Sequence, residues 1–179
     1  MKNITHSLYC LILIIVVSCS SNGCSSKNDY LLRAELAASY DCVDSLSNAW
    51  DYLYQANKET NKVVGVDIAK TIFHKADSLL DQHLQKRDLD SAARCIDIMG
   101  RVISYYGKTI INPGKSGGPD ADTNAKLAKL NKSREQLADL YNEQARSAEN
   151  LWRKYNDPDE QRLWLRSDSL AHVYNPNKY

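Results

Sequence analysis

Apolar residues recur at alternating steps of three and four through most of residues 29–174, and this spacing constrains the fold more than any other feature. The segment 89–106 shows the pattern without a polar interruption, at Leu89, Ala92, Ile96, Met99, Ile103 and Tyr106. An α-helix turns once every 3.6 residues, so side chains at this spacing lie on one face. A helix with a single apolar face must bury that face against a neighbour. The sequence therefore predicts an all-α protein, an elongated antiparallel helical bundle.

Five segments carry this pattern, and capping signals delimit several of them. The expected helices span about 29–57, 62–86, 88–106, 123–155 and 158–173, which predicts a bundle of four to five helices. Asp88 is a typical N-cap residue, and Asp157-Pro158-Asp159-Glu160 combines a capping box with proline at the first helical position. Residues 63–66 have the composition of a strand, which leaves the start of the second helix open.

Polar residues interrupt the apolar stripe of the two longest expected helices. The stripe of the first helix runs through Leu32, Leu36, Val43, Leu46, Trp50 and Leu53. Its one polar position is Ser39. The stripe of the fourth helix runs through Leu127, Leu130, Leu137, Tyr141, Ala148, Leu151 and Tyr155. It is interrupted by Arg134 and Gln144, which either fix the register of the helices, as isolated polar core groups can, or line a polar groove.

A second constraint lies at the N-terminus. Lys2 is followed by the unbroken apolar run Leu8–Val17, which is ten residues long. Ten residues are too few for the roughly 20 that a membrane-spanning helix needs, but they are typical of the hydrophobic region of a secretory signal. The run ends in Val16-Val17-Ser18-Cys19, with an apolar residue three places before the cysteine and a small residue directly before it. This sequence resembles the lipobox of bacterial lipoproteins.

The resemblance implies cleavage before Cys19 and attachment of acyl chains to that residue. It divides the chain into a signal peptide (1–18), a lipidated cysteine with a flexible tether (19–28), a helical domain (29–174) and a C-terminal tail (175–179). It also implies a location in the bacterial cell envelope, facing the periplasm. Ser20 stands where lipoproteins retained in the inner membrane often carry aspartate, which favours the outer membrane.

Other interpretations of the N-terminal segment stay open. It can be an ordinary cleaved signal or an uncleaved membrane anchor. An ordinary signal peptidase site requires two small residues, whereas residues 16–18 supply one. Cys24 is an alternative lipid acceptor, but Ser21-Asn22-Gly23 lacks the apolar residue expected three places before it.

Charge and cysteine content narrow the class of partner. Of the 23 basic residues only Lys2 lies within 1–18, so 22 basic side chains face 22 acidic ones in the remainder. Nucleic-acid binding requires a clustered basic excess, so the sequence predicts no nucleic-acid partner. Exported proteins can hold disulfides, and Cys42 and Cys95 could pair between two helices. They could equally be two buried thiols that act as small apolar residues.

Candidate sites for chemistry are few. His74, Asp77 and Asp81 share one face of the second expected helix, and this set could hold a divalent metal. We adopt the alternative, in which these residues form a charged, solvated face opposite the apolar stripe. No catalytic constellation is recognisable, so we expect neither an enzyme nor a cofactor.

These features together predict a lipid-anchored protein with a helical interaction domain, which binds another envelope protein or the cell wall. Two alternatives remain. One is a helical lipoprotein that binds a small ligand or a metal in a groove. The other is an envelope protein that neutralises a toxin or a phage factor.

Overall fold

The computed structural model describes residues 27–111 and 121–178. Within them the fold is entirely helical, as predicted, and consists of six helices. These are α2 (Lys27–Ala38), α3 (Val43–Thr60), α4 (Val66–Lys86), α5 (Leu89–Ile111), α6 (Ala121–Tyr155) and α7 (Pro158–Tyr174). The signal segment, Cys19, nearly all of the tether and residues 112–120 lie outside the described residues. The helix predicted over 88–106 continues to Ile111, past its predicted end. None of the described helices combines the length and hydropathy that a bilayer span requires.

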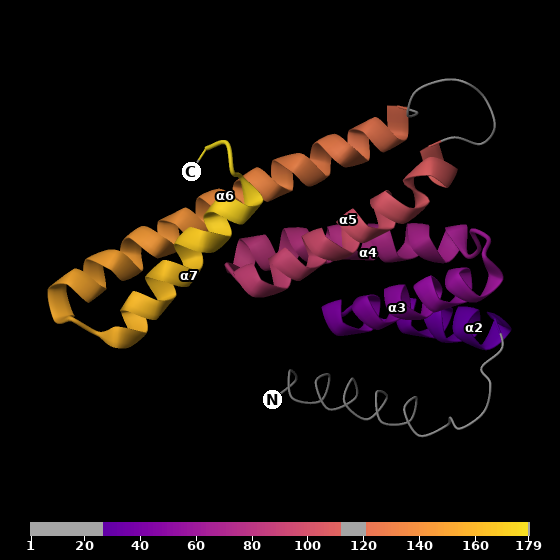
Figure 1. Ribbon diagram of the computed structural model, residues 1–179, viewed down its shortest axis with the longest axis horizontal. Coiled ribbons are helices and arrows are strands. Elements are labelled where there is room, and N and C mark those ends of the chain that lie inside the picture. The colour runs from indigo at the N-terminus through magenta and orange to yellow at the C-terminus, as the bar shows by residue number, and fades with distance from the viewer. Residues whose placement is uncertain (1–26, 112–120, 179) are drawn as a thin grey trace.

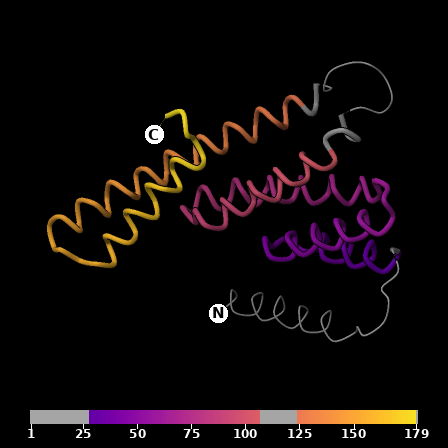
Figure 2. The backbone as a smooth tube through the Cα atoms, in the orientation of Figure 1, coloured from indigo at the N-terminus to yellow at the C-terminus, as the bar shows by residue number. Residues whose placement is uncertain are grey.

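The helices are arranged as three antiparallel pairs in chain order. The pairs α2 with α3 and α4 with α5 pack side by side, and α7 packs against the C-terminal half of α6 (Figure 1). The first two pairs form a four-helix body. The third pair, which we call the hairpin, meets that body chiefly along α5, and its far end around residues 155–158 extends beyond it (Figure 2). The bundle is therefore elongated, as the length of α6 predicts.

The predicted helix 29–57 is wrong, because the chain turns at residues 39–42 and forms two helices. The turn falls at Ser39, the polar position of the predicted stripe. The Ser39 hydroxyl donates to the Leu36 carbonyl at 2.6 Å, and such side-chain bonds compete with continued helix. Lys75 of α4 donates to the Ser39 carbonyl at 2.6 Å and pairs with Asp41 at 2.8 Å. A cation from another helix thus stabilises the C-terminal end of α2.

The turn changes which face of α2 is buried. Leu32 and Leu36, both predicted core residues, are 65% and 47% exposed, whereas Ala34 and Ala38 are fully buried. After the turn α2 folds back on α3, and the small alanines allow the two helices to approach closely. The predicted stripe of α6 fails similarly at its end. Leu151 and Tyr155 are exposed because this part of the hairpin extends beyond the body.

Most other predicted stripe positions are confirmed. Five residues of the α5 stripe are buried, and Ile103 packs partly buried against them. In α4 the whole predicted set Ala69, Ile72, Ala76 and Leu79 is buried. The hairpin joins the same core through Leu130, Leu137, Tyr141 and Ala171. At roughly 25 cal/mol per Å² of apolar surface removed from water, this burial is the main stabilising term. The expected tail also contacts the fold, because Lys178 pairs with Asp139 at 2.7 Å.

The start of α4 depends on Gly65, whose φ of +70° lies in the left-handed region that favours glycine. A Cβ atom there would lie 2.4 Å from Leu53 Cδ1, and the Leu53 side chain is fully buried. We expect Gly65→Ala to lower the free energy of unfolding by about 2–3 kcal/mol, from backbone strain and crowding together. Urea denaturation measures the loss. Gly100→Ala in α5 is the control, because its Cβ would meet only Arg134 Nη2, at 3.4 Å. Equal stability of the two variants would contradict the argument.

Candidate binding groove between the helix pairs

A groove opens where α3, α5 and α6 meet. It has a volume of about 630 Å³ and is lined by Trp50, Asp51 and Tyr54 of α3, by one face of α5 between Asp97 and Tyr105, and by Arg134 of α6. Helical spacing explains the set, because residues three to four apart lie on the same side of a helix. All three helix pairs therefore meet around the groove: the first two supply its walls, and the hairpin supplies a single cationic side chain.

Aromatic rings form one wall of the groove. The Trp50 and Tyr105 ring centroids are 6.0 Å apart at an interplanar angle of 80°, and those of Tyr54 and Tyr105 are 5.7 Å apart at 73°. Both are edge-to-face arrangements, which aromatic pairs favour. Trp50 is buried, Tyr105 is half-buried and Tyr54 is 43% exposed. This wall therefore offers an incoming ligand both apolar ring surface and phenolic hydroxyl groups.

The charged side chains of the groove balance. Asp97 and Arg101 form an ion pair at 2.7 Å, one helical turn apart on α5. Asp51 is exposed, Arg134 is half-buried, and within the described residues neither makes a hydrogen bond or an ion pair. Arg134 lies against Gly100, where the missing side chain leaves room for the guanidinium. Two carboxylates and two guanidinium groups give this part of the surface no net charge.

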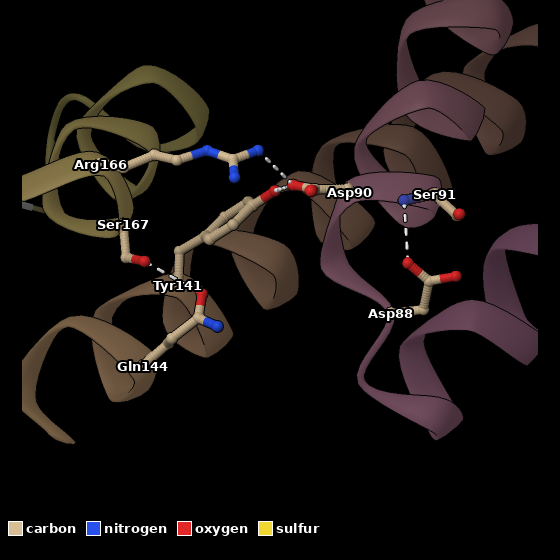
Figure 3. Close-up of polar contacts among 7 residues, drawn as sticks. All are labelled: Asp88, Asp90, Ser91, Tyr141, Gln144, Arg166 and Ser167. Atoms are coloured by element: carbon tan, nitrogen blue, oxygen red, sulfur yellow. Dashed lines mark hydrogen bonds and ion pairs between the residues drawn. The ribbon is translucent and has the colours of Figure 1, made fainter. Parts of the chain in front are cut away.

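A polar joint fixes the hairpin on the body next to the groove (Figure 3). Asp90 of α5 accepts hydrogen bonds from Arg166 of α7 at 2.8 Å and from the Tyr141 hydroxyl of α6 at 3.4 Å. Between the two hairpin helices, Ser167 donates to Gln144 at 3.0 Å. Tyr141 lies seven residues after Arg134 on the same face of α6, so the joint also sets the position of Arg134 against α5.

The tyrosines near the joint are held in their neutral form. Burial is the largest cause that raises the Tyr141 pKa, and the nearby Asp90 carboxylate acts in the same direction. Tyr141 stacks on Tyr174 with ring centroids 6.0 Å apart. Burial likewise raises the pKa of Tyr174; Asp97 adds to this shift, and Arg134 opposes it. The charges of Asp97 and Arg134 therefore act on Tyr174 as well as on the groove.

The start of α5 is stabilised by Asp88, as the sequence predicts. The Ser91 backbone N–H donates to Asp88 Oδ1 at 3.2 Å, and His83 Nδ1 lies 3.0 Å from Oδ2. Burial raises the Asp88 pKa, but the hydrogen bonds from Ser91 and the contact with His83 outweigh it, and the net pKa is lowered. This cap holds the α4–α5 turn beside a small cleft of about 210 Å³ at the joint.

The proposed metal ligands do not come together as a metal site. Lys129 of α6 donates to Asp77 at 2.7 Å and pairs with Asp81 at 3.7 Å, so an ammonium group occupies the position between the two carboxylates. The hydrogen bond that Lys129 donates to Asp77 raises the Lys129 pKa. His74 is exposed and contacts the Phe73 ring. Residues 27–111 and 121–178 contain no group of three or more potential metal ligands.

Cys42 and Cys95 are thiols and are not joined by a disulfide. Cys95 is buried in α5, and this burial raises its pKa to about 11, so it remains a neutral thiol at physiological pH. Cys42 is half-buried at the start of α3, where its thiol lies 3.1 Å from the Ser45 hydroxyl. Of the two interpretations left open by the sequence, the structure favours separate thiols.

The two polar interruptions of the α6 stripe have different roles. Gln144 makes the interhelical hydrogen bond expected of a residue that fixes register, whereas Arg134 lines the groove. The sequence reasoning missed Asp51, Tyr54, Asp97 and Arg101 as groove residues. A signal existed in α5, where Asp97, Arg101 and Ser104 form a polar face beside the apolar stripe.

Comparisons with known protein families, with curated protein sequences and with solved structures found no match. The functional argument therefore depends on the groove, the joint and the N-terminal segment of this chain.

Proposed function

We propose that this chain is a lipid-anchored protein of the bacterial cell envelope, whose helical domain binds the cell wall through the groove. The observation that carries the proposal is the composition of the groove. It is lined by an aromatic wall, in which Tyr54 is the exposed ring, and by a half-buried arginine that makes no hydrogen bond or ion pair within the described residues. Binding sites typically combine apolar and aromatic surface with a few polar groups that orient the ligand.

The cell wall fits this groove better than a nucleic acid or another strongly anionic polymer. Polyanions are bound by a basic excess, whereas the charged residues of this groove balance. Sugar rings have an apolar face and a hydroxyl-bearing edge, which complement tyrosine and tryptophan side chains. The carboxylates Asp51 and Asp97 can accept hydrogen bonds from sugar hydroxyl groups.

The anchor is the other half of the proposal. Two or more acyl chains, each contributing about 0.8 kcal/mol per buried methylene, hold a domain of this size stably at a membrane. Because α2 begins at Lys27, the segment between Cys19 and the domain is 20–26. If extended at about 3.3 Å per residue, it would let the domain reach about 23 Å from the lipid surface. Such a domain could contact wall polymer next to the membrane.

We expect Cys19→Ala to abolish lipid attachment. In bacteria that express the variant, palmitate labelling is lost and the protein leaves the membrane fraction, because no acyl acceptor remains at the lipobox. Cys24→Ala is the matched control and keeps both properties. Labelling that persists in Cys19→Ala and disappears in Cys24→Ala would place the anchor at the second cysteine.

Cell-wall binding is tested by cosedimentation of the full-length protein, in detergent, with purified peptidoglycan. Tyr54→Ala removes an exposed ring from the groove, and we expect about tenfold weaker binding. Tyr155→Ala removes a ring that is 64% exposed at the far end of the hairpin, and we expect no change. Failure of the wild-type protein to sediment would overturn the proposal, as would crosslinking at Tyr54 to an envelope protein without wall binding.

A further inference from the structure

Arg134 differs from the other arginines in the described part of the chain. Seven of them pair with a carboxylate: Arg33, Arg87, Arg94, Arg101, Arg153, Arg162 and Arg166. Arg146 makes no such pair, but its side chain is exposed to water. Arg134 is half-buried in the groove and makes neither an ion pair nor a hydrogen bond with the described residues.

A half-buried guanidinium without a partner costs free energy, because part of its hydration is lost and nothing replaces it. The nearest acidic residue of the groove on α5, Asp97, is already paired with Arg101 at 2.7 Å. Gly100 lets the guanidinium lie close to α5, where an added Cβ atom would be 3.4 Å from Nη2, and Arg134 also lines the open groove. The fold thus leaves a cationic group with its hydrogen-bond donors available to a ligand.

We propose that Arg134 binds a carboxylate of the ligand, so that the groove selects carboxylate-bearing fragments of the cell wall. This inference rests on the proposed wall-binding function and specifies its ligand. A planar guanidinium binds a carboxylate through two parallel hydrogen bonds, among the strongest polar contacts available to a protein.

The charges around the groove favour a singly charged anion. Asp97 is paired with Arg101, so Asp51 and Arg134 are the two lining charges without a partner among the described residues. A phosphate dianion would bring a second negative charge that no further cation of the lining offsets. A monoanionic carboxylate carries half of that charge. The remaining groups suit the rest of such a ligand, because Tyr54 and Tyr105 offer ring faces and Asp51 accepts hydrogen bonds from hydroxyl or amino groups.

The test uses the full-length lipoprotein in detergent and isothermal titration with three probes. The first is a disaccharide that contains muramic acid, whose lactyl ether ends in a carboxylate. The second is the same disaccharide with that carboxylate converted to an amide. The third is a free wall tetrapeptide. The first and third probes distinguish a sugar carboxylate from a peptide carboxylate as the group that Arg134 binds.

We expect the acidic disaccharide or the tetrapeptide to bind. If the sugar supplies the carboxylate, the amide of the disaccharide should bind about 10- to 100-fold more weakly than the acid. Arg134→Gln should weaken binding of the preferred acidic probe by the same factor and remove the discrimination. Arg134→Lys should fall between the two, because it keeps the charge and loses the planar pair of donors. Arg146→Gln changes the same charge at an exposed site of the same helix and should bind as the wild type does.

Thermal unfolding separates this role from a structural one. Removal of a half-buried, unpaired charge should leave the melting temperature of Arg134→Gln unchanged or slightly higher. The inference would be overturned if Arg134→Gln bound every probe as the wild type does. It would also be overturned if the wild type bound peptidoglycan but no acidic probe. Either result would leave the wall-binding proposal standing. A wild-type protein that bound neither peptidoglycan nor the probes would overturn both.

Discussion

Replacement of Asn57 by leucine is expected to lower the free energy of unfolding by about 2–4 kcal/mol, although the two side chains share the same branched arrangement of heavy atoms. Asn57 is 1% exposed at the centre of a polar network. Its Nδ2 donates to the Tyr106 hydroxyl at 2.6 Å, and its Oδ1 accepts from the Val64 N–H at 2.7 Å. Each buried group left without a partner costs about 1–3 kcal/mol. Leucine leaves the Val64 N–H without its acceptor and removes one of the two hydrogen bonds of the Tyr106 hydroxyl, which keeps its bond to the Val64 carbonyl.

Two further variants separate the polar contribution from packing. Tyr106→Phe removes a single hydroxyl, which donates to the Val64 carbonyl at 2.6 Å, and should cost about 1–2 kcal/mol. The double variant Asn57→Leu/Tyr106→Phe should be less destabilised than the sum of the single variants, because both single variants break the same hydrogen bond between Asn57 and Tyr106. Urea denaturation measures all three. Strict additivity would show that the network is not coupled.

The same network makes a prediction for alkaline pH. Burial raises the Tyr106 pKa to about 12, and the hydrogen bond from Asn57 reduces this shift. The folded protein therefore keeps the phenolic proton to higher pH than the unfolded chain does. The stabilisation from this group is complete below about pH 10 and is lost as the pH rises toward 12. Tyr106→Phe should accordingly have a flatter stability profile than the wild type above pH 10.

Asn57 illustrates what could and could not be predicted from the sequence. It lies four residues after Leu53, so it continues the apolar stripe of α3 at a polar position. Ser39, Arg134 and Gln144 interrupt stripes in the same way. Regular apolar spacing was enough to predict the class of the fold and most of the buried positions, because burial of one helix face depends mainly on local periodicity.

The role of each interruption depends on what a distant helix places opposite to it. Ser39 contacts Lys75 and lies in a turn, whereas Gln144 contacts Ser167 and accepts an interhelical hydrogen bond from it. Arg134 lies against Gly100 and is the cation that α6 contributes to the groove. These partners are 23–36 residues away in the chain, and a single sequence contains no signal for which helix faces will meet. The groove could therefore be anticipated only as one of two roles for Arg134.

Leu137→Ala is expected to have the second large effect, and to act first on the hairpin. Leu137 is fully buried on α6, between Arg134 and Tyr141 in sequence, and belongs to the core cluster that the hairpin shares with the body. Leucine-to-alanine changes in cores cost about 2–5 kcal/mol, because apolar contact is lost and a cavity remains. The polar contacts that would still hold the hairpin, such as Arg166 with Asp90, are largely exposed. Each such pair contributes at most about 1 kcal/mol.

Hydrogen exchange in the native state distinguishes detachment of the hairpin from uniform destabilisation. In Leu137→Ala, protection of backbone amides in α6 and α7 should fall by about the full change in free energy, because the hairpin can open locally without unfolding of the body. Backbone amides in α3 and α4 should lose less protection. Leu151→Ala is the control on the same helix: its side chain is 40% exposed, and both protection and global stability should change little.

Detachment also carries Arg134 away from Gly100, so binding of peptidoglycan should weaken in Leu137→Ala under conditions in which the body stays folded. Equal loss of protection in all six described helices would instead mean that hairpin and body unfold as one cooperative unit, and that the groove opens only on global unfolding.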